Sequence, residues 1–319
     1  MSVAMCLLPY SVVVAVLGSP LLVRSTHGGI APRLGVATWV AALASVVLSW
    51  AAAAVFLLLE LVRTWNQPGW SVINSCFSGL RDLVSGRAGV AIQVGLLVLA
   101  VLAVLAVMVV VWRLGCRVLR MRSHTHGHAQ RARIIGRRVA GLDALIVEAP
   151  ERAAYCVAGR PHAIVVTSAA MDALDGPQLE AVLAHERAHL TGRHHQLLAV
   201  LRGLAASLPR MALFTIGAVE VARLLEMCAD DDAVRAHGPR SLLEGLIALS
   251  GAGPIPGGAL AATSIAVLDR AGRLASPPRP AELARMRTFM TAIIVLMAVG
   301  PVVTAMMAST GMVMCGLPG

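Results

Sequence analysis

We predict from the sequence a multi-span α-helical membrane protein that also carries one α+β domain outside the membrane. Of its 319 residues, 57% are hydrophobic and only 14% are charged, and the mean hydropathy is +0.76. Four apolar runs are each long enough for a helix to cross a bilayer core of about 30 Å. Between the third and fourth runs, residues 123–287 show the shorter, mixed pattern of a folded domain.

The four apolar runs define the membrane part of the protein. Residues 1–122 are expected to form a membrane domain with three transmembrane helices, and residues 288–319 a fourth helix with a short tail. The four helices are expected at about 3–23, 34–62, 88–112 and 289–312. The first run has neither a basic leader nor a small-residue cleavage site, so we expect an anchor rather than a cleaved signal peptide.

Arginines set the expected orientation of these helices. Eight of them lie between residues 113 and 138, and the positive-inside rule places such a run in the cytoplasm. We therefore expect a multi-pass protein of the plasma (inner) membrane, with both termini outside and residues 123–287 in the cytoplasm. This topology also explains the net charge of +10. Because no aromatic interleaving or DNA-binding module accompanies the charge, we expect no direct binding of nucleic acid.

The most informative motif is His185-Glu186-Arg187-Ala188-His189. On a helix, two histidines four residues apart lie on one face, so both imidazoles can reach one metal ion. Glu186 is then placed to take a proton from a water at that ion. This arrangement is typical of zinc-dependent peptidases, and the alternative is an unrelated pair of core or surface histidines.

The local sequence favours a helix across this motif. Asp175-Gly176-Pro177 supplies a turn with a proline suited to the first helical position, and Gly192 is a suitable end. Residues 178–190 contain an apolar stripe and neither Gly nor Pro. We therefore expect the histidines in the last turns of a buried helix.

A catalytic zinc site of this kind needs three protein ligands and one open position. Glu226 lies on a second helix-like run and is the expected third ligand of one Zn²⁺ ion. Asp230 lies one turn later on the same face, where it can accept a hydrogen bond from a ligand histidine. The alternative is a solvated acidic helix end, because Asp231 and Asp232 follow.

Residues 197–219 test the topology, because this apolar run is nearly long enough to be a fifth span. A single crossing would separate His185 and His189 from Glu226, and ligands about 2 Å from one ion cannot lie on opposite sides of a membrane. Pro209-Arg210 divides the run into halves of about a dozen residues. We therefore expect a helical hairpin that packs on the domain and dips at most into the membrane interface.

The domain is expected to begin with a short helix near 129–141. Strand-like runs follow at 144–148, 153–157 and 163–167, and then the helices that carry the metal site. We expect the 163–167 strand at an edge of the sheet, where an extended substrate can add to it.

The two helical motifs together resemble a known family. His185-Glu186-x-x-His189 followed by Glu226-x-x-Ala229-Asp230 resembles the gluzincin membrane peptidases, which include the HtpX and CAAX prenyl protease group and the BlaR/MecR group. Upstream, segments within residues 155–168 resemble the strand pair that precedes the zinc helix in BlaR/MecR-type peptidases. The likeness covers about residues 140–240.

This resemblance implies a cytoplasmic α+β zincin-like metallopeptidase domain in which Glu186 is the general base. Its implied substrate is a cytoplasmic protein, a winged-helix transcriptional repressor in a BlaR/MecR-like signalling circuit. Resemblance to HtpX implies instead the degradation of misfolded membrane proteins. BlaR/MecR receptors carry a penicillin-binding sensor domain after their last span, and we expect none here, because no such domain follows residue 312. The third alternative is a non-catalytic receptor or scaffold, which has no need of Glu186.

Peptide hydrolysis also needs a hydrogen-bond donor for the oxyanion. Arg235 and His237 follow Glu226 and are candidates for this role, with solvated surface charges as the alternative. His194 and His195 lie just beyond Gly192. They either support the metal ligands or lie on the surface.

Overall fold

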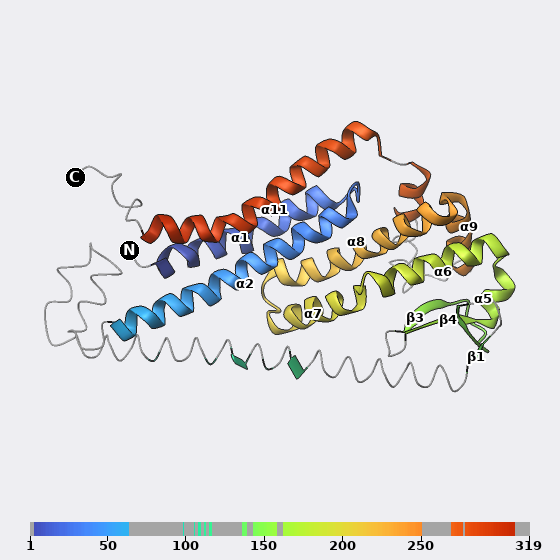
Figure 1. Cartoon of the computed structure of the whole chain (residues 1–319), viewed down its shortest axis with the longest axis horizontal. Helices are drawn as coiled ribbons and strands as arrows, with labels where there is room; N and C mark the ends of the chain where they lie inside the picture. The colour runs from blue at the N-terminus through green and yellow to red at the C-terminus, as the bar shows by residue number, and fades with distance from the viewer. Residues whose placement is uncertain are drawn as a thin grey trace, which may run out of the picture.

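The computed structural model describes residues 3–63, 136–138, 143–157, 162–250, 269–276 and 278–309, together with a few isolated positions between 98 and 116. These residues form a mostly helical protein with one small sheet at the end farthest from the long apolar helices (Figure 1). The expected helix at 88–112 lies largely outside the described residues.

Three of the described helices are long and apolar enough to cross a membrane. They are α1 (Val3–Thr26), α2 (Pro32–Arg63) and α11 (Pro280–Ser309), which lie side by side (Figure 1). They match the expected helices at 3–23, 34–62 and 289–312, although α11 begins earlier than expected. Between Pro280 and Phe289 the chain consists of residues that favour or tolerate a helix, so the helix extends beyond the apolar run.

Polar side chains join α1 to α2. Trp50 donates a hydrogen bond from Nε1 to Ser11 Oγ at 3.0 Å, and the hydroxyl groups of Tyr10 and Ser45 lie 2.9 Å apart. Hydrogen bonds of this kind stabilise helix pairs in a membrane, where water cannot satisfy polar groups. The two helices therefore form a specific pair.

The sheet contains four strands among the described residues, in the order β1 (Arg137–Arg138), β2 (Leu145–Val147), β4 (Ala163–Thr167) and β3 (Ala154–Val157). β2 pairs with β4 in parallel, and the other two pairs are antiparallel. The three expected strands are confirmed. The expected helix at 129–141 is wrong at Arg137–Arg138, because these residues pair with Leu145 and Ile146 and strand pairing overrides their local preference.

The expected position of the 163–167 strand at an edge is also wrong. β4 lies between β2 and β3, and Val165 and Val166 are fully buried. A strand covered on both faces reads as a continuous apolar run, as this one does. The outer strands of the described sheet are β1 and β3, and β3 is the one that contacts α6.

Helices make up the rest of the described domain, namely α5 (Ser168–Ala173), α6 (Gly176–Thr191), α7 (His194–Ser207), α8 (Ala212–His237) and α9 (Pro239–Ser250). The expected hairpin is confirmed by α7 and α8, which turn at Pro209, but it packs on α1 and α2 as well as on the domain. Its second arm and the helix of Glu226, expected as separate elements, are one continuous helix. Residues 212–237 contain no proline and only one glycine, so the helix continues without a break until Gly238.

One hydrophobic cluster connects this hairpin to the membrane helices. Leu213 and Phe214 of α8 and Leu201 of α7 are buried together with Val14 of α1 and Trp39 of α2. A second cluster packs α5 and α6 against the sheet. α8 thus packs against the membrane helices with its first half, while its second half contacts α6.

Candidate metal centre

α6 holds His185 and His189 one turn apart. The helix begins with a capping box, in which Gln178 N donates to Asp175 Oδ1 at 2.9 Å and Asp175 N donates to Gln178 Oε1 at 3.2 Å. The helix ends at Gly192, as expected. On this rigid element the Nε2 atoms of His185 and His189 lie 3.1 Å apart.

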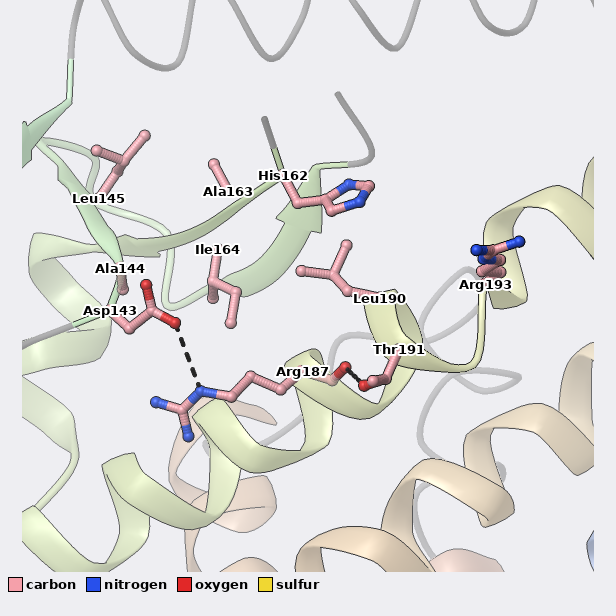
Figure 2. A pocket seen from close by; sticks show the side chains of 10 residues that line it. All are labelled: Asp143, Ala144, Leu145, His162, Ala163, Ile164, Arg187, Leu190, Thr191 and Arg193. Atoms are coloured by element: carbon pink, nitrogen blue, oxygen red, sulfur yellow. Dashed lines mark hydrogen bonds and ion pairs between the residues drawn. The ribbon is translucent and has the colours of Figure 1, made fainter. Parts of the chain in front are cut away.

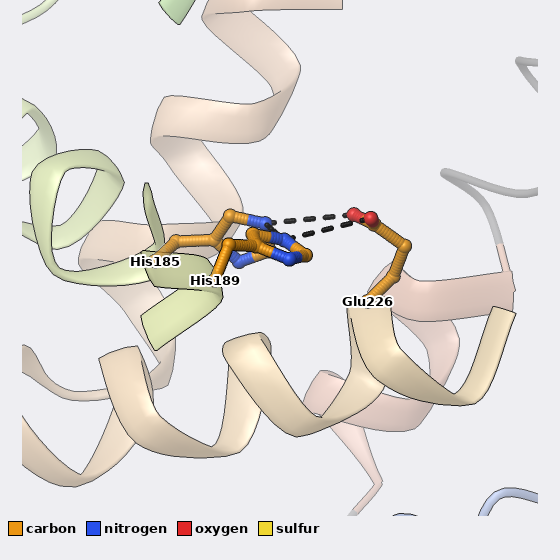
Figure 3. A group of neighbouring side chains, drawn as sticks. All are labelled: His185, His189 and Glu226. Carbon is orange, nitrogen blue, oxygen red and sulfur yellow. Dashed lines mark hydrogen bonds and ion pairs between the residues drawn. The ribbon is translucent and has the colours of Figure 1, made fainter. Parts of the chain in front are cut away.

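α8 brings Glu226 to the same point. Its two carboxylate oxygens lie 3.5 Å from His185 Nε2 and 3.5 Å from His189 Nε2 (Figure 3). One ligand atom from each of the three residues falls within 4.8 Å of the others. The structure therefore brings together the three residues that the sequence predicts as metal ligands, from helices about forty residues apart in the chain.

The donor set fits a zinc ion. Zinc binds imidazole nitrogen and carboxylate oxygen at about 2.0–2.2 Å, so two ligand atoms of a tetrahedral site lie about 3.4 Å apart. The two Nε2 atoms lie 3.1 Å apart here, and each lies 3.5 Å from a different carboxylate oxygen of Glu226. Two neutral nitrogens and one carboxylate leave a fourth position for water or substrate, as in catalytic rather than structural zinc sites.

Asp230 contacts His185, and Arg270 in turn is hydrogen-bonded to Asp230. Asp230 Oδ1 lies 3.1 Å from His185 Nδ1, the nitrogen that faces away from Glu226. Arg270 donates to both carboxylate oxygens of Asp230, and its Nη1 lies 3.5 Å from Glu226. Sequence analysis placed Asp230 but missed Arg270, which lies 40 residues further along the chain, where no helical spacing links it to the site.

These contacts shift the pKa values of the groups involved. Burial by itself lowers the pKa of His185, but the carboxylates of Asp230 and Glu226 more than offset it and raise that pKa to about 9. Burial raises the pKa of Glu226, and the two histidines reverse the effect and hold it well below its usual range. In the same way, Arg270 and His185 lower the pKa of the buried Asp230. The site is therefore organised around ionised carboxylates.

His194 contacts the second ligand histidine. Its Nδ1 lies 2.9 Å from Nδ1 of His189, so that ring faces His194 on one side and Glu226 on the other. Burial, followed by the nearby His189, lowers the pKa of His194 to about 4. The neutral ring can therefore accept a hydrogen bond from the Nδ1–H group of His189. Of the two alternatives for His194, the structure shows the supporting position.

The turn after α6 explains this position. Arg193 adopts the left-handed conformation with φ 50°, which turns the chain back towards the helix. At Gly192 an added Cβ would lie 2.4 Å from His194 Nε2. The Gly192-Arg193 turn thus creates the space in which His194 reaches His189.

Glu186 lies beside the ligand group, between α6 and the outer strand β3. Burial raises the pKa of its carboxyl group, which nearby histidines partly oppose. The backbone amide of Cys156 on β3 also opposes the rise in this pKa. Burial, and then the nearby Glu186, raises the pKa of the Cys156 thiol to about 12, so the thiol stays protonated. A buried carboxyl group with a raised pKa suits proton transfer near neutral pH.

The structure does not bring Arg235 and His237 to the histidines. Both lie in the last turn of α8, and Arg235 is nine residues, or about 14 Å along the helix axis, beyond Glu226. Arg235 is mostly exposed and forms an ion pair with Asp232. Its surroundings match the solvated surface charge that sequence analysis gave as the alternative.

A cavity of about 630 Å³ opens on another side of α6 (Figure 2). Arg187 and Thr191 line it from the helix, and Ile164 lines it from β4. Arg187 reaches across it to Asp143 at 3.8 Å. Neither the two histidines nor Glu226 is among the lining residues, so this cavity is separate from the metal centre.

Three helices apolar enough to cross a membrane, joined to a domain with this His-His-Glu group, are the features of a membrane protein with a candidate metallopeptidase centre. Comparison with known families agrees, because residues 121–250 match the model of peptidase family M48. The matched residues make up less than half of the chain, and the match is consistent with a gluzincin membrane metallopeptidase. Neither a curated protein nor a solved structure matches the chain.

Proposed function

We propose that this protein is a membrane-anchored, zinc-dependent endopeptidase. The observation that carries the proposal is the convergence of His185, His189 and Glu226, whose ligand atoms lie within 4.8 Å of one another, with Glu186 beside them. The match to peptidase family M48 supports a peptidase, and three apolar helices support membrane anchorage.

The residues of the site suit peptide hydrolysis. A zinc ion held by the three ligands would supply a Lewis acid for the substrate carbonyl and for the attacking water. Glu186 accepts the proton that the water loses and later gives it to the leaving amine nitrogen. Because burial raises its pKa, Glu186 holds this proton more readily than an exposed glutamate does, and it can serve in both steps.

β3 is the strand that suits an extended substrate. It is an outer strand of the described sheet, paired with β4, and Cys156 places it beside Glu186. A peptide added along β3 would form main-chain hydrogen bonds and pass beside the general base. Recognition of this kind selects an unfolded or loop segment.

For the physiological substrate, we propose a cytoplasmic protein, namely a winged-helix transcriptional repressor, as the BlaR/MecR resemblance implies. The domain then faces the cytoplasm, as the arginine run between residues 113 and 138 indicates. The alternative is HtpX-like quality control of membrane proteins. Strand addition along β3 would recognise the main chain of a substrate rather than particular side chains. Such broad selectivity favours this alternative. A non-catalytic scaffold fits less well, because it has no need of Glu186.

Zinc content and proteolysis of the detergent-purified protein test the proposal. Wild type should hold one zinc ion and cut an unfolded protein such as casein. Glu186→Gln should keep the zinc and lose cleavage, whereas Glu226→Ala should lose both. Glu180→Gln, an exposed change on the same helix, serves as the matched control and should behave as wild type. Cleavage by Glu186→Gln at the wild-type rate would show that the assignment of the general base is wrong.

A further inference from the structure

We propose that the tip of the α7–α8 hairpin (residues 207–216) is inserted into the bilayer that α1, α2 and α11 cross. This inference concerns where the hairpin lies and does not depend on the proposed peptidase activity. It takes the acyl chains and headgroups of one membrane leaflet as the partner of this surface.

The hairpin packs along the membrane helices rather than beyond their ends. Phe214 stacks on Trp50 of α2 with ring centroids 6.0 Å apart. An added Cβ at Gly18 of α1 would lie 3.6 Å from Leu213. Trp50 and Gly18 both lie well inside the apolar helices, so the start of α8 is level with residues that the membrane surrounds.

Charged and polar groups mark where the membrane begins. Near the α1–α2 connection, Arg223 of α8 donates to the carbonyl oxygens of Thr26 and His27 at 2.9 and 3.1 Å. On α11, the last charge before the long apolar run is Arg287. Just beyond it, Met290 accepts a hydrogen bond from Thr38 of α2 at 3.4 Å. The hydrocarbon boundary therefore lies near the level of Thr38.

The hairpin passes this boundary. An added Cβ at Gly217 would lie 3.1 Å from Trp39, the neighbour of Thr38, so Gly217 is at the boundary level. From Gly217 back to Met211, α8 extends about 9 Å further into the apolar region at 1.5 Å per residue. Elements that lie in a membrane interface reach depths of about 5–10 Å. The tip is therefore deep enough to meet acyl chains.

The outer surface of the hairpin suits this environment. Ile216 and Val200 are each 39% exposed, and Val219 is 67% exposed. Residues 196–219 contain only two charges, Arg202 and Arg210, and no acidic group. Both side chains are exposed. Long arginine side chains can extend to anionic headgroups while their stems stay in the apolar layer.

Some backbone groups of the turn are hydrogen-bonded within the hairpin. Leu208 N donates to Leu204 O at 2.9 Å, and Met211 N donates to Leu208 O at 3.1 Å. Pro209 has no N–H group to satisfy. α8 begins without a side-chain cap, so its first N–H groups are left for lipid headgroups or water at the interface.

Insertion would fix the metal centre at a set height above the membrane. Glu226 lies nine residues beyond Gly217 on the same helix, which places it about 14 Å from the boundary. α7 begins with His194, which contacts His189. Both arms of the hairpin thus connect the bilayer directly to the ligand group.

Photocrosslinking of the full chain in nanodiscs of phosphatidylethanolamine and phosphatidylglycerol tests the proposal. A diazirine amino acid replaces Ile216 at the tip, Val12 on α1 as the membrane control, or Ile247 on α9 as the aqueous control. All three positions are exposed. Mass spectrometry should find lipid adducts at positions 216 and 12 and none at 247. Size-exclusion chromatography identifies any variant that fails to fold.

Two outcomes would overturn the proposal. In the first, position 216 reacts only with water, as position 247 does, while position 12 still forms lipid adducts. In the second, position 216 forms adducts only with protein, which would show that another segment or chain covers the hairpin. As an independent readout, Ile216→Arg should reduce the lipid adducts formed by a diazirine at Val200, whereas Ile247→Arg should not.

Discussion

Arg270 donates two hydrogen bonds to Asp230, from Nε to Oδ2 at 2.8 Å and from Nη2 to Oδ1 at 2.5 Å. Asp230 has no exposed surface and lies 3.1 Å from His185. A residue close to the end of the domain thus orients a candidate metal ligand through one buried carboxylate. Contacts of this kind set the tautomer and direction of ligand histidines.

We expect Arg270→Ala to weaken zinc binding about 10- to 100-fold and to reduce stability by about 3–5 kcal/mol, because it leaves a buried carboxylate without its cation. Chelator competition and thermal unfolding measure the two effects. Arg273→Ala is the matched control, since Arg273 is buried equally but pairs with Asp231 instead. Equal zinc affinities of the two variants would show that Arg270 has only a structural role.

His194→Ala should also weaken zinc binding about 10- to 100-fold, because His189 loses the group that faces its Nδ1. Gly192→Ala should have a similar effect with His194 intact, since the new methyl group would displace the His194 ring. The change His195→Ala removes a neighbouring imidazole and should leave the affinity close to that of wild type. Wild-type affinity in both His194→Ala and Gly192→Ala would contradict the supporting role.

The pKa of His185 predicts how zinc binding depends on pH. In the metal-free protein this pKa is raised from 6.5 to about 9, so the ring is protonated at neutral pH and zinc must displace that proton. The affinity should therefore rise about tenfold per pH unit between pH 6.5 and 9 and then level off. Isothermal titration at four pH values measures the slope. A flat profile below pH 9 would be inconsistent with the raised pKa.

The same shift has the opposite sign for the stability of the metal-free protein. A histidine whose pKa is raised on folding stabilises the folded state fully below pH 6.5 and loses this contribution as the pH rises through about 9. Chelator-treated protein should therefore unfold at a lower temperature at pH 9 than at pH 6.5. Asp230→Asn, which removes the largest charge partner of His185, should reduce this difference.

The capping box of α6 predicts a change in stability without a change in chemistry. Asp175→Ala removes the side-chain acceptor for Gln178 N and should cost about 1 kcal/mol. Calorimetry should show a lower unfolding temperature with zinc stoichiometry unchanged, because the ligands lie at the other end of the helix. Asp172→Ala changes an exposed aspartate outside the box and should have little effect. Loss of zinc in Asp175→Ala would mean that the helix start also positions the site.

Features that follow from neighbouring residues were predictable. The turn at Asp175-Gly176-Pro177, the end at Gly192 and the four-residue spacing of the histidines all act within one helix, so local rules suffice for α6. The apolar runs of α1, α2 and α11 are likewise local features. The pairing of Glu226 with the histidines was predictable for another reason, namely that zinc requires a third ligand.

Contacts between distant segments decided the rest. β4 became a central strand only because β2 and β3 both pair with it, and Arg137–Arg138 became a strand only because β2 lies alongside. Arg270 reaches Asp230 across 40 residues, and α8 packs on α1 and α2 from a far part of the chain. Helix spacing and capping act over a few residues, whereas the partner of a buried charge or of an apolar face depends on the packing of the whole chain.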